Sequence, residues 1–499
     1  MYTLSPETIK YADALAVEKY NIPDIQLMKN AAKSCFDYIC ARISKDDNVL
    51  ILCGKGNNGG DGYEIAHLLK NGGYFVRVIN VFNCLPVTET SKEVFDGCKN
   101  AKVDILPFSS WQEELKKADV VIDALFGVGF YGCISTDSDI GKMLSLCNEC
   151  QVKRIAIDTP SGINSADGRV EDVAFRADFT ITMAYIKTGM ISYPAREYCG
   201  DILVADIGYP APLCEEIKKD ALIPDDEYVK SAIPTRKPNT HKGSYGRLLM
   251  YCASENMTGA GVLAAKAALR SGVGLLNIAR NEKTIRILQN HLIEPIFSCI
   301  DENDKCGQVL SLAEKATAVL IGCGLGTHEI DKDALLSLIK NAKCNLIIDA
   351  DGINLLSENT LILKEADKTP ILTPHPLEFA RLSGKTISEV QQNRINLARD
   401  FAKEHGCVLV LKGASTVIAS PDGRIAVNTS GNPGLSKGGS GDVLAGLIAS
   451  FTAQGISPFD SAVLGVYLHG KAADNLSKTV SEYGLLPSDL PMEIARMLP

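Results

Sequence analysis

Short apolar strands alternate with helical segments through most of the chain, and no other feature constrains the fold as strongly. In the first half, strand-like runs occur at 49–53, 75–82, 119–125, 154–158, 179–183 and 201–207. In the second half they occur at 247–253, 275–279, 318–322, 345–350 and 408–412, before a hairpin at 416–428. Strands separated by helices pair in parallel. We therefore predict an α/β protein with two domains, each built on a mainly parallel sheet.

The stretch 209–240 is rich in proline and charged residues, which predicts a linker with at most a short helix. A length of 499 residues allows three domains or two large ones. Apolar helices expected at 259–272 and 441–453 give the second half a core of its own. We expect domains at 1–210 and 225–499.

The composition excludes several classes of function. A net charge of −9 leaves no basic footprint for nucleic acid, and no apolar run reaches the ~18 residues of a membrane span. The sixteen cysteines lie scattered in apolar segments, and the first residues have no signal-peptide core. These features predict reduced thiols in a cytoplasmic protein. Cys147 and Cys150 form the only C-x-x-C pair, which favours two helix-borne thiols over a zinc or redox site.

A glycine-rich turn at 54–62 follows the first strand and precedes an amphipathic helix, an arrangement that cradles phosphate or nucleotide groups. It matches G-x-G-x-x-G, but the match alone is weak evidence. A dinucleotide site for hydride transfer also needs an acidic residue about 20 positions later. The next strand instead ends near Asn80 and Asn83, which argues against a standard NAD dehydrogenase.

Polar side chains collect where the strands of the first half end. Ligands of parallel sheets bind beyond the carboxyl ends of the strands, and carboxylates and amides there suit cation binding and acid/base chemistry. In the alternative interpretation, each residue merely caps the helix that follows. The residues concerned are Asn57, Asn58, Asp61, Asp123, Asp158 and Ser161.

A second glycine-rich stretch, GNPGLSKGGSGDVLAG at 431–446, leads into an apolar helix. A helix start offers unpaired N–H groups and a positive dipole end to a phosphate. Asp442 lies at this junction, where its carboxylate is suited to take a proton from a substrate hydroxyl during phosphoryl transfer. The alternative is a glycine-rich turn in which Asp442 is an ordinary N-cap.

Three further segments of the second half carry polar chemistry at strand ends. KGAST at 412–416 offers a lysine and backbone amides to nucleotide phosphates, and GCGLG at 322–326 forms a turn open to close approach. His375 and Glu378 follow another strand, with Pro374 and Pro376 stiffening the loop. A lone histidine is more often structural, but here other strand-end motifs accompany it.

Four motifs of the first half occur in order: QLMKNAA (26–32), GNNGGDG (56–62), DALFGVGF (123–130) and DTPSGINSADG (158–168). Together they resemble the NAD(P)H-hydrate epimerase family, across residues 1–210 and with a Rossmann-like fold. The resemblance implies potassium near Asn58, Asp123 and Ser161, with Asp158 as the acid/base residue. Thr159 replaces a residue that is usually hydrophobic. The hydrated dinucleotide is implied to contact Asn57, Asn58, Gly59, Gly60, Asp61, Gly127, Val128, Gly129, Phe130, Tyr131, Gly132, Cys133 and Asp158.

Seven motifs of the second half, from HKGSYGRLL (241–249) through DADGIN (349–354) to GGSGDVLAG (438–446), resemble the NAD(P)H-hydrate dehydratase family of the ribokinase-like superfamily. The resemblance covers residues 225–499. Gly352 stands where the family often has alanine. The implied substrate contacts are Ala260, Gly324, His375 and Asp442. The implied contacts of the donor, ADP or ATP with Mg²⁺, are Lys412, Gly413, Ala414, Ser415, Thr416 and Gly441.

The two resemblances together predict a bifunctional repair enzyme, both isomerase and lyase, that acts on NADHX and NADPHX, the hydrated forms of NADH and NADPH. It would interconvert the R and S hydrates and dehydrate the S form at the expense of ADP or ATP. We also expect a homo-oligomer. One rival is a small-molecule kinase fused to a nucleotide-binding module, which leaves His375 and the N-terminal motifs unexplained. The other is a non-catalytic N-terminal domain, which would be free to lose Asp158, Asn58 and Asp123.

Overall fold

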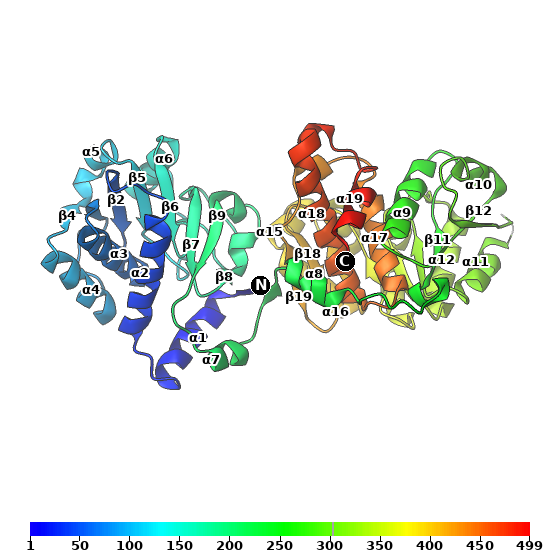
Figure 1. Ribbon diagram of the computed structural model, residues 1–499, viewed down its shortest axis with the longest axis horizontal. Helices are drawn as coiled ribbons and strands as arrows, with labels where there is room; N and C mark the ends of the chain where they lie inside the picture. Colours follow the sequence, from blue (N-terminus) through cyan, green and yellow to red (C-terminus); the bar gives the residue numbers. More distant parts are fainter. Residues whose placement is uncertain (302–303) are drawn as a thin grey trace. The chain divides into compact units, whose positions relative to one another are not determined.

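The computed structural model describes residues 1–301 and 304–499, which form two compact units (Figure 1). One unit comprises Tyr2–Ala221, and the other comprises Leu222–Pro499 together with Met1. The division falls inside the predicted linker. That prediction is wrong in detail, because the stretch carries two helices, α7 (Ala211–Glu216) and α8 (Asp226–Ala232), and the strand β10 (Ala221–Leu222). Buried Leu213 and Val229 anchor these helices to the apolar clusters of their own units.

The sheet of the first unit has the strand order β4-β3-β2-β5-β6-β7-β9, and every neighbouring pair is parallel. This confirms the mainly parallel sheet that the sequence predicts. The sequence misses β4, an edge strand whose residues are at most half-buried and so lack a strong apolar signal. The strands are β2 (Asn48–Cys53), β3 (Phe75–Asn80), β4 (Asp104–Pro107), β5 (Val120–Ala124), β6 (Lys153–Ile157), β7 (Phe179–Met183) and β9 (Asp201–Ala205).

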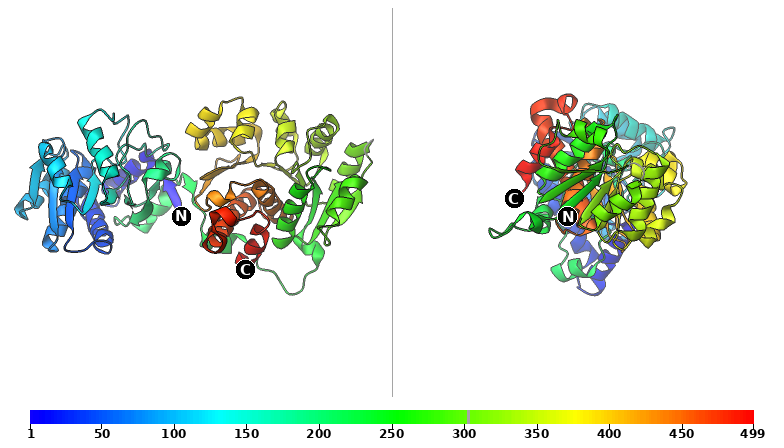
Figure 2. Two further views of the ribbon diagram at one scale, coloured as in Figure 1. Left: turned by 90° about the horizontal axis from the view of Figure 1, so that it is seen from above. Right: turned by 90° about the vertical axis from the view of Figure 1, so that its right-hand side faces the viewer.

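Helices cover both faces of this sheet, so that its strands are buried on both sides (Figures 1 and 2). Val49 and Ile51 of β2 belong to one apolar cluster, while Leu50 and Leu52 belong to the cluster on the other face. This alternation is the two-residue period of a strand. The helices are α1 (Pro6–Glu18), α2 (Asp24–Cys40), α3 (Asn57–Asn71), α4 (Glu89–Asn100), α5 (Trp111–Leu115) and α6 (Asp139–Glu149), with 3₁₀ turns at Phe108–Ser110, Thr188–Ile191 and Ala195–Tyr198.

A small parallel pair lies apart from this sheet within the first unit. It consists of β1 (Tyr2–Leu4) and β8 (Ile186–Lys187), with Leu4 opposite Lys187. Lys187 is fully buried. A buried ammonium needs charged or polar partners, and the first unit supplies them at its candidate site.

The sheet of the second unit runs β13-β12-β11-β14-β15-β16-β17-β18-β19-β10. Its pairs are parallel from β13 to β17, and the predicted hairpin β18–β19 continues it antiparallel. These strands are β11 (Arg247–Tyr251), β12 (Leu275–Arg280), β13 (Ile296–Cys299), β14 (Ala318–Ile321), β15 (Asn345–Ile348), β16 (Ile371–Leu372), β17 (Val408–Leu411), β18 (Thr416–Ala419) and β19 (Ile425–Asn428).

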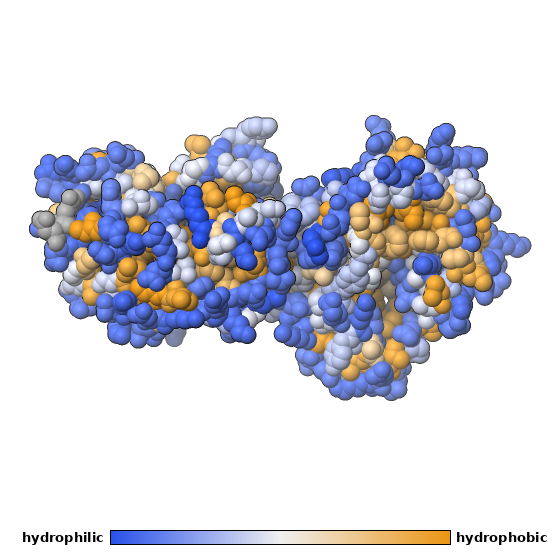
Figure 3. All heavy atoms as spheres, turned by 180° about the vertical axis from the view of Figure 1, so that it is seen from behind, coloured by the Kyte–Doolittle hydropathy of each residue, from blue (hydrophilic) through white to orange (hydrophobic). Residues whose placement is uncertain are grey.

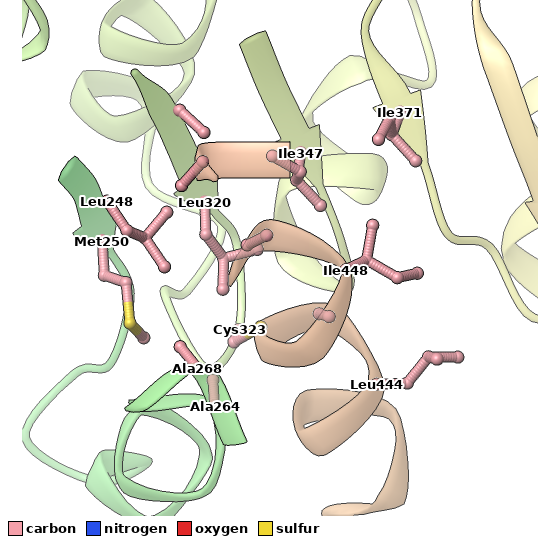
Figure 4. Close-up of a cluster of buried hydrophobic side chains, with 14 of the residues drawn as sticks. Leu248, Met250, Ala264, Ala268, Leu320, Cys323, Ile347, Ile371, Leu444 and Ile448 are labelled. Atoms are coloured by element: carbon pink, nitrogen blue, oxygen red, sulfur yellow. The ribbon is translucent and has the colours of Figure 1, made fainter. Parts of the chain in front are cut away.

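The helix α17 (Ser440–Ala453) lies in the centre of the second unit's core, where Leu444 and Ile448 pack beneath Leu320 and Ile347 (Figure 4). A Cβ on Gly446 would lie 2.1 Å from the carbonyl oxygen of Ala264, so α17 and α9 (Thr258–Arg270) touch backbone to backbone there. This close approach fixes the position of the start of α17. The other helices are α10 (Glu282–Leu288), α11 (Lys305–Ala313), α12 (Glu329–Asn341), α13 (Asp351–Leu356), α14 (Pro376–Ser383), α15 (Ile387–Gln392), α16 (Arg394–His405), α18 (Pro458–Gly484) and α19 (Leu490–Met497), with 3₁₀ turns at Lys242–Tyr245, Thr360–Glu365 and Pro433–Leu435.

The surface is largely hydrophilic on the face shown in Figure 3, with apolar patches between the polar side chains. Such patches are ordinary on folded proteins. Among the described residues, no helix combines the length and hydropathy that a membrane crossing requires.

Candidate active sites

The start of α17 forms the first candidate site. Gly439 precedes the helix with φ +102°, a left-handed conformation that glycine adopts without strain. A Cβ on Gly441 would lie 3.3 Å from Nζ of Lys412, so the lysine ammonium reaches the first turn of the helix. Free N–H groups, the positive end of a helix dipole and an ammonium therefore meet at one place, as an anionic ligand requires.

Asp442 lies in this first turn, beside Asp349 and Cys323. The side-chain oxygens of the two aspartates and the cysteine sulfur all lie within 4.8 Å of one another. Burial raises the pKa of Asp442 to about 6, and the negative charge of Asp349 adds to the rise. A hydrogen bond from Cys323 and the charge of Lys412 partly oppose it. A carboxylate with this pKa is ionised at neutral pH and is still basic enough to accept a proton.

Asp349 directly follows β15 and is 1% exposed. Lys412 Nζ lies 2.9 Å from its Oδ1, and Thr373 Oγ1 donates to the same oxygen at 2.6 Å. Burial lowers the pKa of Lys412, but Asp349 and then Glu378 raise it by more, so the net shift is upward. The ion pair leaves Asp442 as the carboxylate of the cluster that is free to act on a ligand.

Arg394 of α16 holds the KGAST segment from behind. Its guanidinium donates to the carbonyl oxygens of Leu411 at 2.8 Å and of Lys412 at 3.1 Å. Gly413 turns beside it with φ +142°, where a Cβ would lie 3.1 Å from a guanidinium nitrogen. The predicted donor segment, Lys412 to Thr416, is thus a tight turn whose geometry depends on a buried arginine.

His375 caps α14 rather than standing free. Its Nδ1 accepts from the backbone N–H of Glu378 at 3.2 Å. The Glu378 carboxylate in turn accepts from the backbone N–H of His375 at 2.7 Å. Nearly half of its side chain, 46%, remains exposed. His375 therefore has the structural role that the sequence leaves open, while its ring edge remains accessible to a ligand.

Gly324 and Ala260, two predicted substrate contacts, do come together. Gly324 has φ +61°, and a Cβ there would lie 2.9 Å from the Cβ of Ala260 and 2.7 Å from the carbonyl oxygen of Met257. No room remains for a side chain, so backbone alone faces a ligand at Gly324.

The second candidate site lies at the start of α3 in the first unit. Asn58 is 8% exposed, and neither atom of its side-chain amide has a hydrogen-bond partner among the described residues. Asp123, fully buried at the end of β5, accepts from the backbone N–H and the hydroxyl of Ser161, both at 2.7 Å. Burial raises the pKa of Asp123 to about 6 against these hydrogen bonds. An orphaned amide oxygen and a buried carboxylate are ligand types that fit a cation of low charge.

Asp158 follows β6 with φ +66°, a strained conformation for a non-glycine residue that is typical of functional sites. Its Oδ2 accepts from the backbone N–H of Val128 at 2.9 Å, and its Oδ1 contacts the ammonium of Lys187. A Cβ on Gly127 would lie 2.9 Å from Asp158 Oδ2 and 3.2 Å from the Cβ of Asn58. Gly127 therefore borders both Asn58 and Asp158, and Val128 contacts Asp158.

The remaining predicted contacts of this site divide into two groups. Asn57 accepts a hydrogen bond from Thr88 at 2.7 Å, and Gly59 lies so close to Gly54 that a Cβ would be 2.0 Å from its carbonyl oxygen. A Cβ on Gly60 would likewise clash, at 2.6 Å from Ser91 Oγ. In the strip after β5, the ring of Phe130 packs against that of Phe126, and four residues are exposed: Gly129, Tyr131, Gly132 and Cys133.

Sequence reasoning assigns no role to Lys187, Asp13, Asp349, Arg394 or Cys323. Asp349 lies in the DADGIN motif, so the sequence could have identified it as a site residue. Lys187 is 29 residues from Asp158 in the chain and carries no local motif, because the β1–β8 pairing brings it into place. Only the tertiary structure identifies it.

A buried carboxylate of raised pKa, a lysine and a glycine-rich helix start define a phosphate-handling enzyme of ribokinase-like fold. Its chain carries a second α/β site of amides and carboxylates. Comparisons with known proteins give the same division: residues 248–496 match the family described as NAD(P)H-hydrate dehydratase, and residues 24–189 match the family of YjeF-related protein N-termini.

Whole-length relatives complete the identification. The chain is 34% identical to the bifunctional NAD(P)H-hydrate repair enzyme of Moorella thermoacetica, over 98% of this chain and 95% of that one. It is 31% identical to the enzyme of the same name from Escherichia coli, over 99% and 94%. The chain belongs to this family of bifunctional NAD(P)H-hydrate repair enzymes, which combine a dehydratase with an epimerase.

A solved structure supports the fold of the second unit. The ADP/ATP-dependent NAD(P)H-hydrate dehydratase of Bacillus subtilis, co-crystallised with ATP and Mg²⁺, is 34% identical and has a TM-score of 0.52. The match covers 56% of this chain and 98% of that one. The ribokinase-like fold predicted for the C-terminal half is therefore confirmed.

Proposed function

We propose that the first unit interconverts the R and S hydrates of NADH and NADPH at Asp158, and that the second unit dehydrates the S hydrate at Asp442. The donor for the second reaction is ADP or ATP. The single observation that carries the proposal is the start of α17, where Asp442, with a pKa of about 6, lies beside a lysine and free helix N–H groups.

The need for a phosphate donor follows from leaving-group chemistry. Direct loss of the C6 hydroxyl would expel hydroxide, whose conjugate acid has a pKa of ~15.7. Phosphate leaves far more easily, since its corresponding pKa is roughly 6. Ten pKa units correspond to about 14 kcal/mol, of which a fraction lowers the barrier. Asp442 takes the hydroxyl proton during transfer, and the ring nitrogen then expels the phosphate.

Lys412 and the turn behind it supply the positive surface for the donor's phosphates. The contacts proposed for the nucleotide are Lys412, Gly413, Ala414, Ser415, Thr416 and Gly441, and those for the hydrate are Ala260, Gly324, His375 and Asp442. Mg²⁺ keeps several waters and binds chiefly through substrate phosphates, so we propose that it enters with the nucleotide. Asp349 is already paired with Lys412, which argues against a separate metal cage there.

In the first unit, Asn58, Asp123 and Ser161 would hold potassium. The unpartnered amide of Asn58 supports this assignment, as does the low charge of the three proposed ligands, of which only Asp123 is a carboxylate. A bound monovalent cation would fix the Asn58 amide and offset the charge of Asp123. The epimerase is needed because a dehydratase that accepts one configuration would leave the other hydrate unrepaired.

We further propose a cytoplasmic homo-oligomer. All sixteen cysteines are free in the structure, which supports a reducing compartment. Light scattering of the purified chain measures the assembly state. A single mass equal to one chain at micromolar concentration would contradict the oligomer.

The test of the function is incubation with both purified hydrate epimers, with ADP and ATP offered separately, followed by chromatography. We expect the S hydrate to return to NAD(P)H only with a nucleotide, and the R hydrate to follow through the S form. Without nucleotide, only interconversion should occur. Consumption of both epimers without a donor, or of neither with one, would contradict the proposal.

A further inference from the structure

Three carboxylates and one ammonium gather around the candidate epimerase site, and the function described so far assigns acid/base chemistry to only one of them. Asp61 lies in the first turns of α3, Asp13 on α1, Asp158 after β6, and Lys187 on β8. The charges of Asp158 and Lys187 act on the pKa of Asp13 and on that of Asp61. The unequal surroundings of Asp61 and Asp158 suggest different tasks.

Asp61 is placed to face the same ligand as Asp158. It follows Asn58 by three residues on α3, so both side chains lie on one face of the helix. Asn58 and Asp158 in turn border the same point beside Gly127. The strands that lead to these residues, β2 and β6, flank β5 on either side, so the residues meet at the carboxyl edge of the sheet.

The carboxyl group of Asp158 is held in place by fixed donors. Both of its oxygens accept hydrogen bonds, from Val128 N–H and from the ammonium of Lys187. Lys187 is fully buried and also donates to Thr182 Oγ1 at 2.8 Å and to the Met183 carbonyl at 3.0 Å. The lysine therefore spends all three of its donors on fixed acceptors, one of which is Asp158.

Asp61 has the opposite surroundings. Within residues 1–301 and 304–499, no hydrogen bond or ion pair engages its carboxyl group. Burial raises its pKa well above the usual range, and the charges of Asp158 and Asp13 raise it further, while Lys187 opposes them. A half-buried carboxyl group with no partner and two like charges nearby favours its protonated form.

We infer that Asp61 donates the proton to the departing hydroxyl during epimerisation, that Asp158 accepts a proton from the entering water, and that Lys187 is the positioning residue that holds the Asp158 carboxyl group in place. This inference rests on the proposed epimerase function. It assigns separate roles to two carboxyl groups whose surroundings differ, as acid–base pairs in enzymes require.

The step balances without a further reactant. The C6–O bond of the hydrate breaks, its oxygen takes the Asp61 proton and leaves as water, and the lone pair of N1 forms a C6=N1 double bond. A water then adds to C6 from the other face, its second proton passes to Asp158, and the electron pair returns to N1. Proton exchange with solvent restores Asp61 and Asp158, and in the reverse reaction the two groups exchange roles.

Asp13 sets the strength of the acid. Tyr209 donates to its Oδ1 at 2.5 Å, which favours the charged form, although burial raises the pKa of Asp13 overall. A charged Asp13 disfavours a second charge on Asp61. Removal of the Asp13 charge should therefore let Asp61 lose its proton at lower pH.

The test uses the full chain without nucleotide, so that only epimerisation proceeds, with the spontaneous rate subtracted. Asp61→Asn should lower kcat by about 10²-fold or more while KM changes by less than about threefold, since the amide keeps the shape but has no proton to give. Asp46→Asn, an exposed carboxylate of the same unit, is the matched control and should match wild type. Asp13→Asn should move the high-pH decline of the rate to lower pH.

In water labelled with ¹⁸O, each inversion should place one ¹⁸O at C6. Asp61→Asn activity within about threefold of wild type would overturn the inference, as would inversion that retains the original oxygen. If Asp61→Asn does not fold, an Asp13→Asn variant whose pH–rate profile matches that of the wild type would overturn the inference. A wild-type chain that does not epimerise at all would instead remove the proposed function itself, and the inference with it.

Discussion

The two glycine-rich helix starts of this chain look alike in sequence and differ in charge. At α17, the glycines lie beside Lys412, and one aspartate remains free to react. At α3, the same kind of turn is followed by an orphaned amide and lies among buried carboxylates. The comparison teaches that a glycine-rich turn supplies close backbone approach, while the residues around it decide between an anion and a cation.

The largest expected effect comes from removing the reactive carboxylate at one helix start only. Asp442→Asn should lower the dehydration rate by about 10²–10⁴-fold, because the general base is lost. Epimerisation should be unchanged, since it takes place in the other unit. Both rates are measured on the same preparation by chromatography of the hydrates. Dehydration within a few-fold of wild type would exclude Asp442 as the base.

Potassium removal is the matching test at the other helix start. Replacing potassium salts with tetramethylammonium should slow epimerisation by about tenfold or more, a loss typical of disrupted metal sites. Asn58→Ala should produce the same loss at saturating potassium, whereas Asn71→Ala, at the exposed end of the same helix, should not. An unchanged rate with trace potassium excluded would argue against the cation site.

The pH dependence of the dehydration rate is a smaller effect, and it is governed by the Asp442 site. Asp442 must be ionised to accept a proton, and its pKa is about 6. The rate should therefore be level above pH 7 and fall as the pH drops through 6, to about one tenth of the plateau at pH 5. A stopped assay across this range measures it. A rate that rises toward acid would mean that a protonated group acts in its place.

The smallest effect concerns the packing that holds α17. Gly446→Ala would place a Cβ 2.1 Å from the Ala264 carbonyl oxygen, and the resulting strain should cost about 1–3 kcal/mol. In a domain of this size, Tm falls by roughly 2–4 °C for each kcal/mol. Gly438→Ala, where no atom lies within 4 Å, is the matched control for Tm. Equal Tm values for the two variants would show that α9 and α17 separate easily.

Sequence patterns predict most of the fold, because buried parallel strands leave long apolar runs such as 49–53 and 318–321. They miss β4 and β13, which are partly exposed edge strands, and β16, which is two residues long. The same apolar runs mark where each strand ends, so the sequence also locates the polar site residues that follow the strands. Lys187 and Arg394 are not, since each acts on a segment distant in sequence that only folding brings near.

The exposed thiols of the chain are sites for covalent labelling. Of the sixteen cysteines, Cys84, Cys133 and Cys299 are exposed, and the others are buried or half-buried. Cys133 ends the strip that begins with Gly127 and Val128 at Asp158. A maleimide fluorophore on Cys133, with Cys84 and Cys299 changed to serine, would therefore report ligand occupancy of the first unit without the engineering of a new attachment point.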